Sequence, residues 1–184
     1  MIITEFLDEH DYPQFRDWLL EQDTETLQLY FGIAGNDHII ESLMKRVLSD
    51  TGDHHFLLAL DEGRWVGTIH IVTNKKTVEF GIIVHKDYRG QGIANLLMDE
   101  AITWTRNRGY RDLYMHCLGW NTAIKHICYK HGLKTVNMMG DTEAELHLPP
   151  ANWVTISKEF CTKQRNLYHT TLHNNWMLYR EIYG

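Results

Sequence analysis

The stretch from Thr77 to Ala94 constrains the fold most, because it combines a strand, a glycine-rich turn and the start of a helix. Apolar residues alternate with other residues from Thr77 to Val84, which is typical of a β-strand buried on one face. Helical spacing then takes over, with apolar residues at Ile93, Leu97, Ala101 and Trp104. The turn between them is Arg-Gly-Gln-Gly-Ile-Ala, and its glycines let the backbone turn sharply and come close to a ligand.

This turn is a candidate anion site. The first N–H groups of a helix lack intrahelical partners, and the helix dipole favours negative charge beside them. A diphosphate would be held there by backbone donors, with Arg89 adding charge. An ordinary glycine-containing connection is the alternative, because the hexapeptide alone is a weak signal. The apolar strand from Asp112 to Cys117 favours the anion site, since strand, helix and strand form a right-handed crossover with parallel strands.

In this context the chain resembles the GNAT N-acetyltransferase superfamily. In that superfamily the pattern Arg/Gln-x-x-Gly-x-Gly/Ala is the acetyl-CoA diphosphate loop, which Arg89, Gly92 and Ala94 match. The resemblance covers about Asp23 to Trp153. It implies an α/β GNAT-type acyl-CoA N-acyltransferase fold, with a mixed central sheet, helices on both faces and a C-terminal helical extension. It also implies an acetyl-CoA cleft between two parallel strands.

The chain is most similar to a bacterial subgroup of this superfamily. The strand after the loop helix has the sequence Leu-Tyr-Met-His-Cys-Leu at residues 113–118, as in the subgroup. A Leu-Pro-Pro-Ala segment follows the last strand at residues 148–151. This likeness says little about the substrate.

The resemblance also implies cofactor-binding residues. Backbone groups of Ile82, Ile83 and Val84 would bond the pantetheine arm, and an N–H at or beside Val84 would polarise the thioester carbonyl. Asn121 would contact the CoA arm, and a plain helix N-cap is its alternative role. The diphosphate would be bound by Arg89, Gly90, Gln91, Gly92, Ile93, Ala94 and Asn95.

The predicted base is Glu79, which occupies a strand position where many members of the superfamily carry a glutamate. Gly81, on the same face of the strand, is expected to leave room for a substrate beside it. Its alternative role is a solvated or salt-bridged strand glutamate. The usual tyrosine acid has no match, because its position is Cys128 and Tyr129 lies about 100° further round the helix. We consider Cys128 a core residue in preference to a proton donor. His116 is a second catalytic candidate, as a proton relay, and a packed histidine is its alternative.

Periodicity and turn residues predict the other elements. Three successive antiparallel strands are expected between residues 54 and 84, and helices between Asp11 and Ser49 would roof the substrate side. Tyr30 and Phe31 in this roof are the candidate substrate-binding residues, beside a glycine break. Strands are expected at residues 2–7, 54–61, 64–73, 77–84, 112–118, 133–138 and 142–148. Helices are expected at residues 12–22, 24–31, 36–49 and 93–107, and from residue 121 or 122 to Gly132.

Pro149 and Pro150 mark a boundary, which gives an acetyltransferase domain at residues 1–150 and a helical extension at residues 151–184. One or two helices are expected in the extension. Their apolar stripe must be buried on the domain or on a second subunit, and the second case would make a homodimer. The stripe consists of Trp153, Ile156, Phe160, Leu167, Leu172, Trp176, Tyr179 and Tyr183.

Composition excludes other classes of protein. The 184 residues carry a net charge of −6, and the 18 basic residues form no stripe, which argues against a nucleic-acid partner. No apolar run approaches the ~20 residues that span a bilayer, and the N-terminus lacks signal-peptide features, so we expect a cytoplasmic protein without a membrane partner. Twelve histidines include no convincing metal site, so no metal is expected.

The leading function is therefore transfer of an acetyl group from acetyl-CoA to a primary amine by direct attack in a ternary complex. The acceptor would be a small-molecule or protein amine. One alternative is a CoA-binding sensor or regulatory module with little turnover, which the missing tyrosine would suit. A second is a docking protein that uses the aromatic C-terminal tail.

Overall fold

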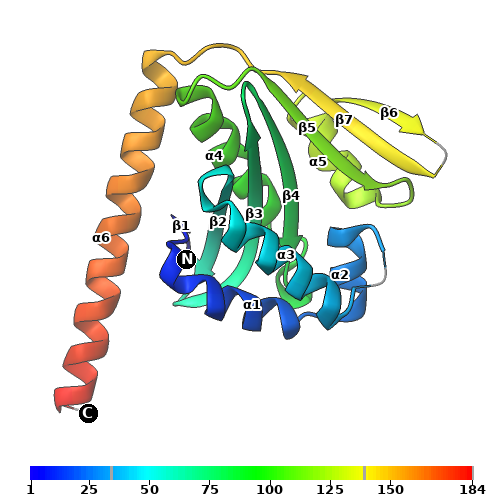
Figure 1. Cartoon of the computed structure of the whole chain (residues 1–184). Coiled ribbons are helices and arrows are strands. Elements are labelled where there is room, and N and C mark those ends of the chain that lie inside the picture. Colours follow the sequence, from blue (N-terminus) through cyan, green and yellow to red (C-terminus); the bar gives the residue numbers. More distant parts are fainter. Residues whose placement is uncertain (34, 139, 184) are drawn as a thin grey trace.

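The computed structural model describes residues 1–33, 35–138 and 140–183. It also describes the side chains of these residues, except at 137, 138, 170 and 172–183. A seven-stranded mixed sheet has the order β1-β2-β3-β4-β5-β7-β6 (Figure 1). Every neighbouring pair is antiparallel except β4 and β5. The strands are β1 (Ile2–Phe6), β2 (His54–Asp61), β3 (Arg64–Asn74), β4 (Thr77–Val84), β5 (Asp112–Leu118), β6 (Lys134–Met138) and β7 (Asp141–His147).

Helices cover both faces of this sheet, which confirms the predicted fold class (Figure 1). One face carries α1 (Tyr12–Leu20), α2 (Thr24–Phe31) and α3 (Asp37–Ser49), and the other carries α4 (Ile93–Asn107) and α5 (Thr122–Lys130). A single helix, α6 (Trp153–Tyr183), forms the extension. Short 3-10 helices are η1 (Glu9–Asp11), η2 (Thr51–Asp53) and η3 (Lys86–Tyr88).

Capping residues explain where these helices begin. The side chain of Asp23 accepts a hydrogen bond from the Thr26 N–H at 3.1 Å at the start of α2. Asn36 caps α3 and Asn121 caps α5 in the same way. Each cap satisfies a backbone donor that the first helical turn leaves unpaired. The predicted starts of these three helices are confirmed.

Alternation along the strands divides the core into two clusters. Phe56, Leu58 and Ile83 pack under α1 and α3 together with Phe15 of α1. Odd-numbered residues of β2, such as Leu57, instead join the cluster under α4 and α5. Because side chains of a strand point alternately to opposite faces, the register of β4 decides which of its residues reach each face.

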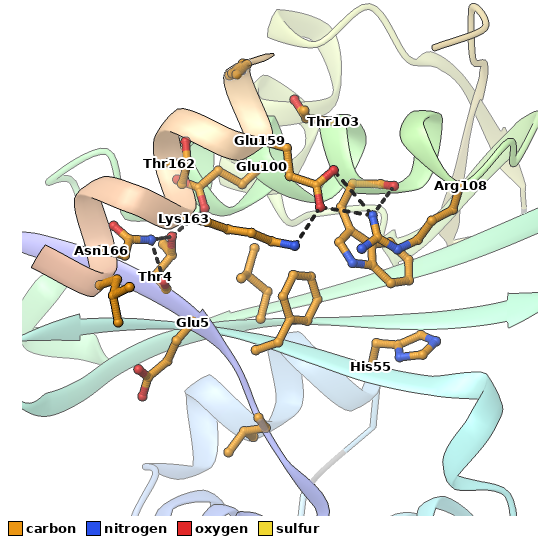
Figure 2. A pocket seen from close by; sticks show the side chains of 16 residues that line it. Thr4, Glu5, His55, Glu100, Thr103, Arg108, Glu159, Thr162, Lys163 and Asn166 are labelled. Carbon is orange, nitrogen blue, oxygen red and sulfur yellow. Dashed lines mark hydrogen bonds and ion pairs between the residues drawn. The ribbon is translucent and has the colours of Figure 1, made fainter. Parts of the chain in front are cut away.

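The helix α6 contacts the domain through polar side chains. Asn107 of α4 donates to Glu159 Oε2 at 2.6 Å, and Arg108 pairs with Glu159 at 3.1 Å. Further along, Asn166 Nδ2 donates to Thr4 Oγ1 at 2.9 Å. Thr4, Arg108, Glu159 and Asn166 line a cavity of about 570 Å³ between α6, α4, β1 and β2 (Figure 2).

The described part of the apolar stripe on α6 faces solvent. Trp153 is 78% exposed, and Ile156 and Phe160 are more than half exposed. Burial on its own domain, one of the two expected outcomes, therefore does not occur at these positions. The side chains of Leu172, Trp176, Tyr179 and Tyr183 lie outside those described. These exposed positions leave the second outcome, burial on another subunit, as a proposal.

Candidate active site

The two parallel strands pair over only three residues. Thr77 to Glu79 of β4 lie opposite Asp112 to Tyr114 of β5, and no further pairing joins the strands. On its other side β4 pairs with β3 through to Val84. The part of β4 beyond Glu79 therefore has backbone groups that are not paired toward β5, and the gap between the strands opens a cleft.

A cavity of about 710 Å³ extends from this cleft to the turn before α4. Of the predicted cofactor-binding residues, all except Gln91 line it. Gln91 is exposed, and its side-chain Nε2 donates to the carbonyl of Asp87 at 3.2 Å. The residues that line it are Ile82, Ile83, Val84, Arg89, Gly90, Gly92, Ile93, Ala94, Asn95 and Asn121.

Two glycines in the turn have left-handed backbone. Gly90 has a φ of 76°, and Gly92, the N-cap of α4, has a φ of 83°. A Cβ added at either position would meet no atom within 4 Å. Gly92 and the first residues of α4, Ile93 to Asn95, line the cavity, and the dipole of the helix favours an anion at this end. These features fit a diphosphate group.

Arg89 joins the turn to α2. Its Nη2 donates to Thr26 Oγ1 at 2.6 Å, and its Nη1 lies 3.5 Å from Glu25 Oε1. The Thr26 hydroxyl also donates to Asp23 at 2.7 Å, and this hydrogen bond is the main cause that lowers the pKa of Asp23. The guanidinium is thereby held at the rim of the cavity by the first turn of α2.

The far wall of the cavity begins at Asn121. Its side chain accepts from Ile124 N–H at 3.2 Å, so it acts as the N-cap of α5 and also lines the cavity. Trp120, which the sequence analysis did not single out, is exposed beside it. Asn95 on the opposite wall lies 3.3 Å from His131 Nε2. Asn95 of α4 and the residues Trp120 and Asn121 just before α5 thus line the same cavity.

Glu79 is the last residue of β4 that pairs with β5, and it is exposed. Its cross-strand neighbours are Val72 and Tyr114. His116, two residues after Tyr114 on β5, is exposed on the same face as Tyr114 and is paired in register with Glu143 of β7. Neither Glu79 nor His116 lines the cavity, so the two predicted catalytic residues lie outside the predicted cofactor-binding space.

Tyr30 and Phe31 form an aromatic pair at the end of α2, with ring centroids 4.8 Å apart. The sequence analysis expected Gly81 to leave room for a substrate beside Glu79. That expectation is wrong, because the ring of Tyr30 occupies the space above Gly81. A Cβ added at Gly81 would lie 3.0 Å from Cε2 of Tyr30. The missing side chain of Gly81 makes room for the ring of Tyr30.

Two buried histidines, His70 and His54, lie next to Tyr30. The Tyr30 hydroxyl lies 3.1 Å from His70 Nδ1, and His70 Nε2 lies 2.8 Å from His54 Nδ1. Burial lowers the pKa of His70 to about 3, with His54 as the next cause. Sequence reasoning missed this pair, because β2 and β3 bring the two histidines together only by their register.

The position of the usual tyrosine acid is filled by a core residue. Cys128 is fully buried, and burial raises the pKa of its thiol to about 11. Its Sγ lies 4.0 Å from Met115 Sδ. Tyr129 is 81% exposed and points away from the core, as predicted. Cys128 therefore has the packing role that we preferred for it.

Within residues 1–33, 35–138 and 140–183, three histidine, cysteine, aspartate or glutamate side chains nowhere gather in a way that would hold a metal ion. In the same part of the chain, no helix combines the length and apolar character required to cross a bilayer.

Comparisons with known proteins match this arrangement. The model of the acetyltransferase (GNAT) family matches residues 5–133. The structure resembles spermidine N-acetyltransferase from Vibrio cholerae, in complex with CoA and spermine, with a TM-score of 0.65, 14% identity, and coverage of 80% of this chain and 95% of that chain.

Two further structures are similar in fold. PaiA N-acetyltransferase from Thermoplasma acidophilum, in complex with coenzyme A, has a TM-score of 0.62 at 18% identity, with coverage of 80% and 99% of the two chains. Ribosomal-protein-alanine N-acetyltransferase from Brucella melitensis has a TM-score of 0.61 at 17% identity, with coverage of 79% and 99%. At these identities the likeness concerns the fold alone.

Proposed function

Because the chain belongs to the acetyltransferase (GNAT) family, we propose that it moves an acetyl group from acetyl-CoA to a primary amine by direct attack in a ternary complex. The observation that supports this most is the cleft between β4 and β5, which ends at the glycine turn of α4. The turn would hold the diphosphate, and the backbone groups of residues 82–84 that face β5 without pairing to it would hold the pantetheine arm. The CoA thioester would supply the activated acetyl group.

Residues of this chain have separate tasks in the proposal. An N–H at or beside Val84 polarises the thioester carbonyl, and such a donor contributes most when it is fixed in advance. Glu79 takes a proton from the amine, directly or through a water molecule, since an amine with a reference pKa of ~10.4 is mostly protonated at neutral pH. Holding both reactants in one cleft lowers the barrier further, because the reaction becomes effectively intramolecular.

The acceptor in this proposal is a small-molecule or protein amine. The net charge of −6 suits a cationic acceptor and disfavours nucleic acid. We also propose a homodimer through α6, since Trp153, Ile156 and Phe160 form an apolar stripe that faces solvent.

Turnover tests this function. The purified chain is incubated with acetyl-CoA and a panel of primary amines that includes polyamines, amino sugars and peptide N-termini, and release of free CoA thiol is followed. We expect acetylation of at least one amine, identified by a mass increase of the product. CoA release without an acetylated product would indicate hydrolysis and would contradict the proposed reaction.

A CoA-binding sensor is the second candidate, and one observation favours it. The usual acid position is the fully buried Cys128, whose thiol cannot reach the cleft. A sensor binds CoA tightly and acetylates no member of the panel. An enzyme without a dedicated acid still turns over, because the CoA thiolate is a good leaving group.

A further inference from the structure

Three side chains from three elements form a hydrogen-bonded series on the acceptor side of the sheet. Tyr30 of α2 contacts His70 of β3, which contacts His54 of β2. His70 is only 5% exposed and His54 only 6%. A buried polar group without a partner costs about 1–3 kcal/mol, so each member of this series depends on the others. Tyr30 is therefore held in place by partners in the core.

The histidine pair is buried and packs against an aromatic ring. The ring of His70 stacks on Phe56 at 4.3 Å and on His54 at 5.0 Å. Burial is the first cause that lowers the pKa of both histidines. The charged or titratable groups that act on the pair are Arg46 of α3, Asp50, Asp53 and His55, and Glu79 of β4 acts on Tyr30. Two neutral imidazoles can share one hydrogen between them, which suits the 2.8 Å contact.

The ring of Tyr30 lies between the solvent-exposed part of β4 and the part that is buried under the helices. Glu79 is exposed, Gly81 lies under the ring, and Ile83 is buried beneath the helices. These three residues share one face of the strand. An amine that approaches Glu79 along this face therefore meets Tyr30 before it reaches the part of β4 that lines the cavity.

We propose that Tyr30 limits the size of the amine that is accepted, and that His70 and His54 are positioning residues that hold its ring over Gly81. The inference rests on the proposed function and deepens it. The wild-type protein would prefer slender, unbranched alkyl amines over amines that carry a bulky ring on the alkyl chain. Shortening Tyr30 would open the space over Gly81 to amines that carry a ring.

The test measures kcat/KM for two primary amines, propylamine and phenethylamine, and uses their ratio. A ratio cancels any loss of folded protein, because both amines are measured on the same preparation. In Tyr30→Ala we expect the ratio of phenethylamine to propylamine to rise about tenfold, the discrimination typical of a change of pocket size. An unchanged ratio would overturn the inference.

His70→Phe tests the positioning role. The phenyl ring can still stack on Phe56, but it lacks the nitrogen atom that contacts the Tyr30 hydroxyl. The ring of Tyr30 is then held less firmly over Gly81, so the ratio of phenethylamine to propylamine should rise about threefold in the wild-type background. In the Tyr30→Ala background it should change nothing, because residues that act through one another are non-additive. An equal effect in both backgrounds would contradict a role through Tyr30.

Thr68→Val is the matched control. Thr68 is buried two residues before His70 on the same face of β3, and its hydroxyl donates to the Leu57 carbonyl at 3.1 Å. Its loss removes one buried hydrogen bond without touching Tyr30, and the ratio should stay at the wild-type value. Wild-type protein that binds CoA and acetylates neither these amines nor any of the panel would refute the proposed function, and the inference with it. Wild-type turnover with an unchanged Tyr30→Ala ratio would refute the inference alone.

Discussion

Glu79 and Tyr114 form the last paired position between β4 and β5. Beyond them β4 continues to Val84 and β5 to Leu118 without pairing to each other. The same point of the sheet therefore ends a parallel ladder, begins a cleft and carries an exposed carboxylate. This coincidence places a candidate base three residues before Ile82, the first residue of β4 that lines the cavity in which we propose that the coenzyme lies.

Replacing Glu79 with glutamine tests its role as the base. Glu79→Gln keeps the shape of the side chain and removes its basicity, so acetylation should fall about 100-fold while CoA affinity stays unchanged. Initial rates and calorimetric titration with CoA measure the two effects. Glu62→Gln, in the exposed turn between β2 and β3, is the control and should leave the rate unaltered. A Glu79→Gln enzyme with the full rate would remove Glu79 from the mechanism.

A pair of glycine substitutions separates backbone strain from ligand binding. Gly92 and Gly109 flank α4, both have a φ near 80°, and neither has an atom within 4 Å of an added Cβ. Gly92→Ala and Gly109→Ala should thus each cost about 1–2 kcal/mol of stability. Only Gly92→Ala should also weaken CoA binding, because only Gly92 lines the cavity. Equal CoA affinities in the two variants would argue against binding at this turn.

The stability of the protein should decrease in acid because of His70. Its pKa is about 3 in the folded protein against an ordinary 6.5, so between these values the unfolded chain binds a proton that the folded protein does not. The free energy of unfolding should thus fall as the pH drops from 6.5 towards 3, by at most about 1.4 kcal/mol per pH unit from this group. Urea denaturation at pH 7, 6 and 5 measures this slope.

His70→Phe should flatten that slope, since the group responsible is gone. The contribution of His54, whose pKa is also lowered by burial, should remain in the variant. A slope identical to that of the wild-type protein would mean that His70 binds its proton equally well in the folded and unfolded states.

The exposed stripe on α6 predicts self-association. We expect sedimentation at micromolar concentration to give twice the 21.7 kDa of the chain. Phe160→Glu places a charge in the stripe and should return the protein to a monomer. Gln14→Glu, with the same change of charge at an exposed site on α1, should not. A monomeric wild-type protein would refute the homodimer.

The elements around the glycine turn could be predicted from sequence, because their signals are local. Alternation in β4, helical spacing in α4 and caps at Asp23, Asn36 and Asn121 each depend on neighbouring residues. The mixed sheet and the cleft between its two parallel strands followed from the family resemblance. The predicted cofactor-binding and catalytic residues remain predictions, although most of the former line one cavity.

What escaped sequence reasoning depends on contacts between distant segments. Gly81 looked like space for a substrate, yet α2 brings Tyr30 onto it from 51 positions earlier in the chain. His54 and His70 meet because β2 and β3 pair in one particular register. The apolar stripe of α6 was expected to be buried on the domain or on a second subunit. The hydrogen bonds of α6 to the domain come instead from the polar residues Glu159 and Asn166. None of these three contacts could be predicted from a periodic pattern of residues in the sequence.

Calorimetric titration of the purified protein with CoA tests the central claim most directly, since the whole account depends on coenzyme binding at the turn before α4. The account predicts saturable binding with one CoA per chain, weakened in Gly92→Ala and retained in Gly109→Ala. Absence of any CoA binding by the folded wild-type protein would contradict it.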